Sequence, residues 1–126
     1  MIKSIIKILD ENEKEIKKLD AGEGEQIPTL EEVIDLTAGK IGLNCEIKVA
    51  GIGERVVEVF KKEGILDSVM ISSFLHDELI KIKKMERSVT IASLEPSDGN
   101  MRFTTETKKQ MVQFVEKNQF QALNLV

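Results

Sequence analysis

Polar and apolar residues alternate along residues 43–49, and this is the most informative pattern in the chain. The segment LNCEIKV places Asn44, Glu46 and Lys48 between Cys45, Ile47 and Val49. Because successive side chains of a strand point to opposite faces, a strand here has one polar and one apolar face. A buried charge is costly unless it is paired or coordinated. The pattern therefore indicates either a catalytic strand or an edge strand with one hydrated face and a weak surface ion pair.

Apolar residues at helical spacing predict two helices before this strand. The first runs from about Ile2 to Leu19. The second begins at the T-x-x-E capping box formed by Thr29 and Glu32 and ends near Gly39.

Helices and strands alternate regularly after residue 50. We expect helices over 51–64, 76–85 and 104–118, and strands over 67–73, 88–94 and 121–126. A longer loop over 95–103 contains Pro96 and Gly99. This alternation is typical of parallel βαβ units. The sequence predicts an α/β fold with about four parallel strands, either an open doubly wound sheet or part of a (β/α)8 barrel.

The length and composition of the chain narrow its class. A chain of 126 residues fits a single domain over 1–126. The formal charge of -4 and the absence of Trp and Tyr argue against a nucleic-acid partner. Apolar runs are too short to span a membrane, and the N-terminus lacks the features of a signal peptide. We therefore predict a cytoplasmic protein without a membrane span.

Two local motifs have alternative interpretations. Cys45 is the only cysteine and lies on the apolar face of the predicted strand, so we interpret it as a small apolar residue. The segment KVAGIGERVV resembles the opening of a dinucleotide-binding fingerprint. The match is weak because Val56 stands where a third glycine or alanine belongs. The next strand also ends in serines without the acidic residue that holds a ribose.

Four segments together resemble the glycerophosphodiester phosphodiesterase family. They are IKKLDAGEGEQIPTLEEVIDL, LNCEIKV, DSVMISSFLHDELIKIKK and SVTIASL, in this order. The resemblance runs from about Glu15 to the end of the chain and leaves the first dozen residues without a counterpart. It implies a partial TIM-type (β/α) barrel that contains the middle strands, preceded by an N-terminal helix.

The resemblance also implies roles for individual residues. Glu46 corresponds to a ligand of a divalent metal ion, Mg²⁺ or Ca²⁺. Lys48 corresponds to the lysine that contacts the substrate phosphate, and it is the candidate catalytic residue. Ser73 and Phe74, next to Ser72, are candidate substrate-binding residues at the same rim. The alternative is that a serine caps the following helix and Phe74 only packs.

Two further residues have weaker expectations. His76 is the only histidine, and its family counterpart lies outside the catalytic pair. We expect it to be partly exposed in the first turn of a helix. Asn124, in the last strand, is expected to point into the mouth of the barrel.

The chain also departs from the family pattern. It lacks the His-Arg-Gly strand, the Glu-x-Asp metal pair, the second histidine and the Trp-Thr segment of the family. In the family, the histidines supply the general acid and base and the Glu-x-Asp pair binds the metal, so the metal site is expected to be weak or incomplete and activity impaired.

Two functions remain open. One is a phosphodiesterase of lipid metabolism that hydrolyses glycerophosphodiesters to glycerol 3-phosphate and an alcohol, with the absent strands supplied by another polypeptide or a longer chain. The other is a non-catalytic remnant or a binding or structural module of the same fold. Both predict a homo-oligomer or a complementing polypeptide, because open parallel sheet edges are rarely left unpaired.

Overall fold

The computed structural model describes residues 13–126, which belong to two compact units, Met1–Ile41 and Gly42–Val126. The single domain expected over 1–126 stays a prediction. Most of the predicted N-terminal helix lies outside the described residues. The described part contains α1 (Glu13–Ile16), and turns replace the helix before the predicted end at Leu19. Asp20 follows these turns, and its carboxylate accepts hydrogen bonds from the backbone N–H groups of Gly22 and Gly24.

Helix α2 (Leu30–Thr37) forms where the capping box predicts it. The Thr29 hydroxyl accepts a hydrogen bond from the Glu32 backbone N–H at 3.2 Å. The Glu32 carboxylate accepts one from the Thr29 backbone N–H at 2.7 Å. Two backbone donors that the first turn leaves free are thereby paired. Gly39 follows the helix with a φ of 72°, a conformation that glycine adopts without steric cost.

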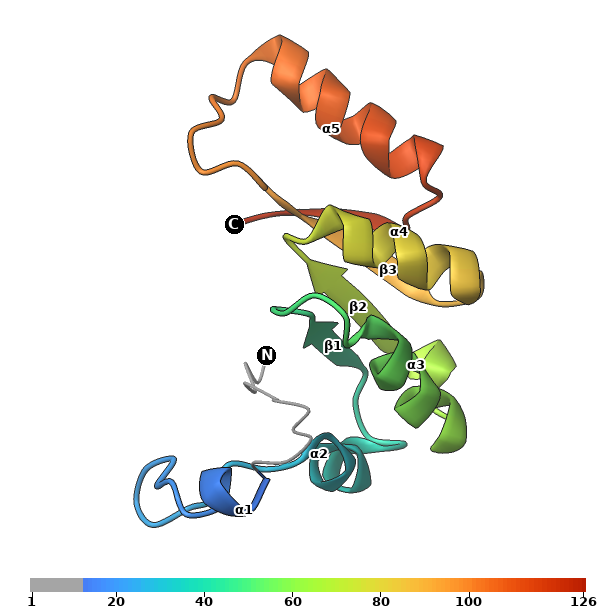
Figure 1. The fold of residues 1–126 in the computed structure, drawn as a ribbon. Coiled ribbons are helices and arrows are strands. Elements are labelled where there is room, and N and C mark those ends of the chain that lie inside the picture. The colour runs from blue at the N-terminus through green and yellow to red at the C-terminus, as the bar shows by residue number, and fades with distance from the viewer. Residues whose placement is uncertain (1–12) are drawn as a thin grey trace. The chain divides into compact units, whose positions relative to one another are not determined.

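The second unit is a four-stranded parallel sheet with the order β1-β2-β3-β4, and its helices cross between successive strands (Figure 1). Its elements are β1 (Leu43–Glu46), α3 (Gly53–Lys62), the 3₁₀ turn η1 (Leu66–Ser68), β2 (Val69–Ser73), α4 (His76–Met85), β3 (Thr90–Glu95), α5 (Thr105–Lys117) and β4 (Ala122–Leu125). The predicted α/β class with four parallel strands is confirmed.

The strand order separates the two predicted architectures. A doubly wound sheet reverses its order at a switch point, whereas these strands follow one another without reversal. Right-handed crossovers then place successive helices on the same face of the sheet. Figure 1 shows α3 and α4 along one such face. The arrangement is that of a partial barrel, with β1 and β4 as the edge strands of the described sheet.

Apolar side chains fill the space between the sheet and its helices. Ile71 of β2 and Ile91 of β3 are fully buried on the helix side of the sheet. Phe60 of α3 and Leu79 of α4 are fully buried as well. These residues fix the positions of β1 and β2, whose ends carry the candidate site. In the part of the chain that the structure describes, no helix has the length and apolar character to cross a membrane.

Candidate functional site

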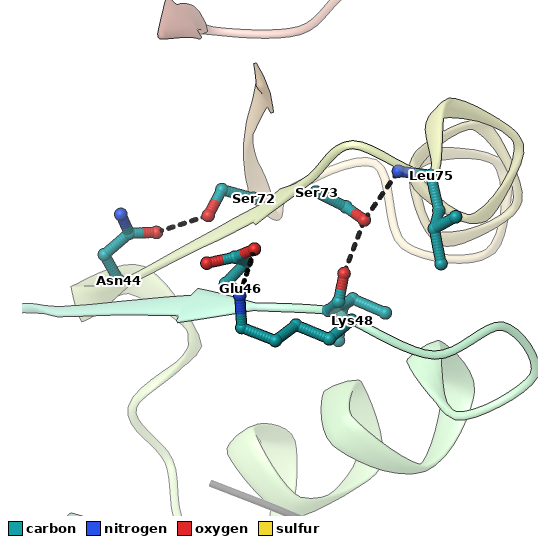
Figure 2. A network of polar contacts seen from close by, with 7 residues as sticks. Asn44, Glu46, Lys48, Ser72, Ser73 and Leu75 are labelled. Carbon is teal, nitrogen blue, oxygen red and sulfur yellow. Dashed lines mark hydrogen bonds and ion pairs between the residues drawn. The ribbon is translucent and has the colours of Figure 1, made fainter. Parts of the chain in front are cut away.

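The polar face predicted for the first strand lies on β1, opposite the helices. Glu46 is aligned with Ser72 of β2, and Ser72 with Ala92 of β3, so these residues share one face of the sheet. Asn44 lies on the same face by the two-residue period of a strand. The Ser72 hydroxyl donates a hydrogen bond to Asn44 Oδ1 at 2.9 Å (Figure 2). β1 therefore joins its neighbour through side chains as well as through the backbone.

β1 is shorter than the predicted strand over 43–49. It ends at Glu46, although the Ile47 N–H still donates to the Ser72 carbonyl at 2.8 Å. Beyond this point the Ser73 hydroxyl donates to the Ile47 carbonyl at 2.6 Å and accepts from the Leu75 N–H at 2.9 Å (Figure 2). The ladder ends because β2 leaves the sheet after Ser73, and a side chain then replaces the backbone partner.

Ser73 is completely buried, and its hydroxyl binds two backbone groups. The alternative, in which a serine caps the following helix, is not what forms: the N-cap residue of α4 is Leu75 without a side-chain cap, and Ser73 binds the backbone just before the helix. Phe74 follows β2 and is 38% exposed. Direct substrate contact by either residue stays a prediction.

Glu46 and Lys48 form an ion pair at the carboxyl end of β1. Lys48 Nζ lies 2.7 Å from Glu46 Oε1 (Figure 2). The Lys48 side chain is 59% exposed and that of Glu46 is 32% exposed. An exposed pair of this kind contributes only ~0–1 kcal/mol to stability. The pair is therefore not needed for folding, and the ammonium group keeps donors that an incoming anion can use.

Two other predicted positions lie on this sheet. Asn124 of β4 is aligned with Leu94 of β3, which by the strand period shares the face of Ala92. Asn124 is half-buried.

Cys45 lies on the opposite face of β1, where burial, with a smaller effect of the neighbouring Glu46 carboxylate, raises its pKa to about 11. A thiol with such a pKa is a poor nucleophile at neutral pH.

His76 is the first residue of α4 and is partly exposed, as predicted. No sequence pattern indicates which residue it contacts. His76 Nε2 lies 3.1 Å from the Oε1 atom of Glu95, a buried residue at the end of β3. Its ring stacks on Phe114 of α5 at a centroid distance of 4.7 Å. The Glu95 Oε2 atom accepts from the Ser97 N–H at 3.0 Å, so each oxygen of the carboxylate has a partner. The signal that could have identified Glu95 is its place in the alternation of β3, two residues after Ser93.

The glycine-rich segment before α3 is filled by a carboxylate of the protein itself. Glu78 of α4 is buried and accepts hydrogen bonds from the backbone N–H groups of Gly51 and Gly53. Burial opposes the ionisation of Glu78, but the hydrogen bonds from Lys81 and from these two glycines lower its pKa overall. The donors that a nucleotide phosphate would need are therefore already used. The geometry of this segment thus gives no support to a dinucleotide-binding site.

A divalent metal ion is not held by the described residues alone. Within residues 13–126 there is no group of three or more His, Cys, Asp or Glu residues placed to hold a metal ion. Glu46 offers a single carboxylate, one oxygen of which already faces Lys48. Hard cations such as Mg²⁺ and Ca²⁺ take six or more oxygen ligands, from protein and water together. The residues present do not fit such an ion without ligands from elsewhere.

Comparison with known proteins places these features in a family context. No family model matches the chain. A glycerophosphodiester phosphodiesterase from Caldanaerobacter subterraneus subsp. tengcongensis is 42% identical over 94 residues, which cover 64% of this chain and 39% of the relative. The chain is similar in sequence to glycerophosphodiester phosphodiesterases. The predicted resemblance to this family is confirmed.

A solved structure supports the same fold. The crystal structure of a candidate glycerophosphodiester phosphodiesterase from Galdieria sulphuraria matches with a TM-score of 0.74 and 24% identity. The match covers 92% of this chain and 48% of that one. The chain thus spans less than half the length of either protein, which agrees with a partial barrel.

Proposed function

We propose that this chain is a glycerophosphodiester phosphodiesterase-like domain whose Glu46–Lys48 pair receives the phosphate of a glycerophosphodiester. The proposal depends mainly on one observation, the exposed ion pair at the carboxyl end of a parallel strand. Active sites of (β/α)8 barrels lie at this end of the strands. Lys48 Nζ would offset the charge of the phosphate, and Glu46 would hold the ammonium group near the sheet.

The reaction of the family would be hydrolysis of the phosphodiester to glycerol 3-phosphate and an alcohol. We propose that this chain alone catalyses it poorly, because the acid and base of the family are absent from the sequence. Mg²⁺ or Ca²⁺ would bind weakly through Glu46 until further ligands are supplied. The acid, the base and the further metal ligands would come from another polypeptide or from a longer chain that carries the absent strands. The open edges β1 and β4 support such association.

Phosphate binding tests the proposal directly. Glycerol 3-phosphate is titrated into the ¹⁵N-labelled chain, and amide shifts are followed by NMR for the native protein, Lys48→Met and a control, Lys109→Met. Lys109 is an exposed residue of α5, far along the chain from β1. We expect shifts around residues 46–48 and a loss of affinity of roughly tenfold or more in Lys48→Met, because charge-assisted hydrogen bonds are the stronger class. Unchanged affinity in Lys48→Met would refute the proposed role.

Activity is tested separately with glycerophosphocholine and Mg²⁺ or Ca²⁺. We expect little turnover by the isolated chain and a clear increase when a polypeptide carrying the absent strands is added. No turnover in either case would count against the enzyme.

A non-catalytic binding or structural module is the second candidate. It is favoured by the absence of a metal-binding cluster from residues 13–126. Glu46→Ala distinguishes the two functions. Unchanged affinity for glycerol 3-phosphate and for Mg²⁺ would favour the structural module, whereas a loss of either affinity would favour the enzyme.

A further inference from the structure

The orientation of the Asn44 side-chain amide is determined by its neighbour on β2. Ser72 is only 1% exposed, and its hydroxyl donates to Asn44 Oδ1 at 2.9 Å. If the amide were rotated by 180°, the Ser72 hydroxyl would accept from the NH₂ group, and its proton would lose the acceptor on Asn44. Losing the acceptor of a buried donor is unfavourable. The observed orientation is therefore the stable one.

This orientation leaves the Asn44 Nδ2 group free to donate. Asn44 is exposed, and no residue of the described chain binds its Nδ2 atom. Figure 2 shows the amide nitrogen directed away from Ser72. A buried serine thus holds an exposed amide with its two donors presented outward. The asparagine is more restricted than an ordinary surface residue, because its acceptor is already occupied.

The amide shares its face of β1 with the proposed phosphate-binding group. Lys48 folds back onto Glu46, so its ammonium group lies beside the residue two positions after Asn44. Residues two apart on a strand are separated by roughly 6.6 Å. An ammonium group beside Glu46 and an amide donor on the neighbouring position of the same face suit a ligand that carries a phosphate at one end and a hydroxyl a few bonds away. Simple phosphates and alkyl phosphates would engage only the first group.

We propose that Asn44 is a specificity-determining residue that donates a hydrogen bond to a hydroxyl of a polyol phosphate whose phosphate lies on Lys48. The inference depends on the proposed function, since it assumes that the Glu46–Lys48 pair receives the phosphate. It goes further by assigning recognition of the polyol part of the ligand to Asn44 and its orientation to Ser72. Asn44 acts on the ligand directly, whereas Ser72 is a positioning residue.

The test compares two ligands of similar size and charge, glycerol 3-phosphate and propyl phosphate, which lacks the hydroxyls. Dissociation constants are measured by NMR titration for the native chain, Asn44→Leu, Ser72→Ala and a control, Asn100→Leu, in an exposed loop. We expect the native chain and the control to prefer glycerol 3-phosphate by about three- to tenfold, the range of one neutral hydrogen bond. Asn44→Leu should bind both ligands equally, with its affinity for propyl phosphate unchanged. Ser72→Ala should show a reduced preference.

The outcomes separate this inference from the proposed function. If Asn44→Leu keeps the preference while Lys48→Met still loses phosphate affinity, the role of Asn44 is refuted and the proposed function stands. If the native chain binds neither ligand, both fail. Circular dichroism spectra and urea midpoints of the variants show whether each one is folded. If Asn44→Leu does not fold, Asn44→Ala replaces it with the same expected loss of preference.

Discussion

Ser73 and Ser93 offer a matched test of how the end of β1 is held. The two serines are register partners on β2 and β3, and both are completely buried. The Ser73 hydroxyl binds the Ile47 carbonyl and the Leu75 N–H. The Ser93 hydroxyl has no hydrogen-bond partner among the described residues. The same substitution, serine to alanine, therefore removes two hydrogen bonds at one position and none at the other.

The expected magnitudes follow from burial. Ile47 is 2% exposed, so its carbonyl cannot recover a water molecule when the Ser73 hydroxyl is removed. An orphaned buried acceptor costs about 1–3 kcal/mol. Leu75 is partly exposed, and water can replace its lost partner at little cost. We expect Ser73→Ala to lower the free energy of unfolding by about 2 kcal/mol. Ser93→Ala should leave it unchanged or raise it slightly, because burying a hydroxyl without a partner is unfavourable.

Urea unfolding followed by circular dichroism at 222 nm measures both effects. The chain contains no Trp or Tyr, so intrinsic fluorescence is a poor probe. The urea dependence of the unfolding free energy should be the same in the native chain and both variants, which shows that the midpoints report stability. Equal destabilisation by the two substitutions would refute the reasoning, because burial alone would then explain the loss. A stable Ser73→Ala variant would show that the Ile47 carbonyl finds another partner.

Three further predictions concern the second unit. Hydrogen bonds from Lys61 and Ser88 lower the pKa of Glu86 from 4.5 to about 2, so its contribution to stability is present above pH 4.5 and is lost as the pH falls towards 2. Glu86→Gln should remove this part of the acid dependence in pH-dependent urea midpoints, and an unchanged profile would contradict it. Gly53→Ala should lower the free energy of unfolding by about 1–3 kcal/mol, because the added Cβ atom would lie 2.7 Å from Ile82 Cδ1. The control Gly99→Ala should be neutral in the same urea assay, because its added Cβ atom has no other atom within 4 Å. Cys45, with a pKa of about 11, should react with iodoacetamide at pH 8 much more slowly in the folded chain than in urea. Mass spectrometry measures both rates, and equal rates would refute the raised pKa of the thiol in the folded chain.

Local patterns in the sequence were sufficient to predict most of the second unit. The period of two in LNCEIKV identified β1, and the alternation of strands and helices identified the parallel sheet. The capping box at Thr29 also located the start of α2. These features depend on neighbours within a few residues, which is why they can be read from sequence. The choice between a doubly wound sheet and a partial barrel required the strand order, which depends on contacts between distant segments.

Contacts between distant side chains could not be predicted in the same way. Alternation predicts a strand to residue 49, three residues beyond the observed end of β1, because the Ile47 carbonyl is bound by the Ser73 hydroxyl, 26 residues away. Pro96 predicts a loop that includes Glu95, although Glu95 ends β3 and pairs with His76. Alternation predicts which face of a strand a side chain takes. It does not predict which partner the side chain meets there.

The contrast between three glutamates strengthens the case for β1 as the site of ligand binding. Glu78 and Glu95 are buried, and each is bound by backbone N–H and by a neighbouring side chain. Such carboxylates are fixed by the fold, because removing a partner would leave a buried polar group less well compensated. Glu46 is different: it pairs with the exposed Lys48, and an exposed pair adds little to stability. A charged pair that adds little to stability, at the end of a parallel strand where barrel enzymes bind ligands, supports the proposal that this end of β1 receives a ligand.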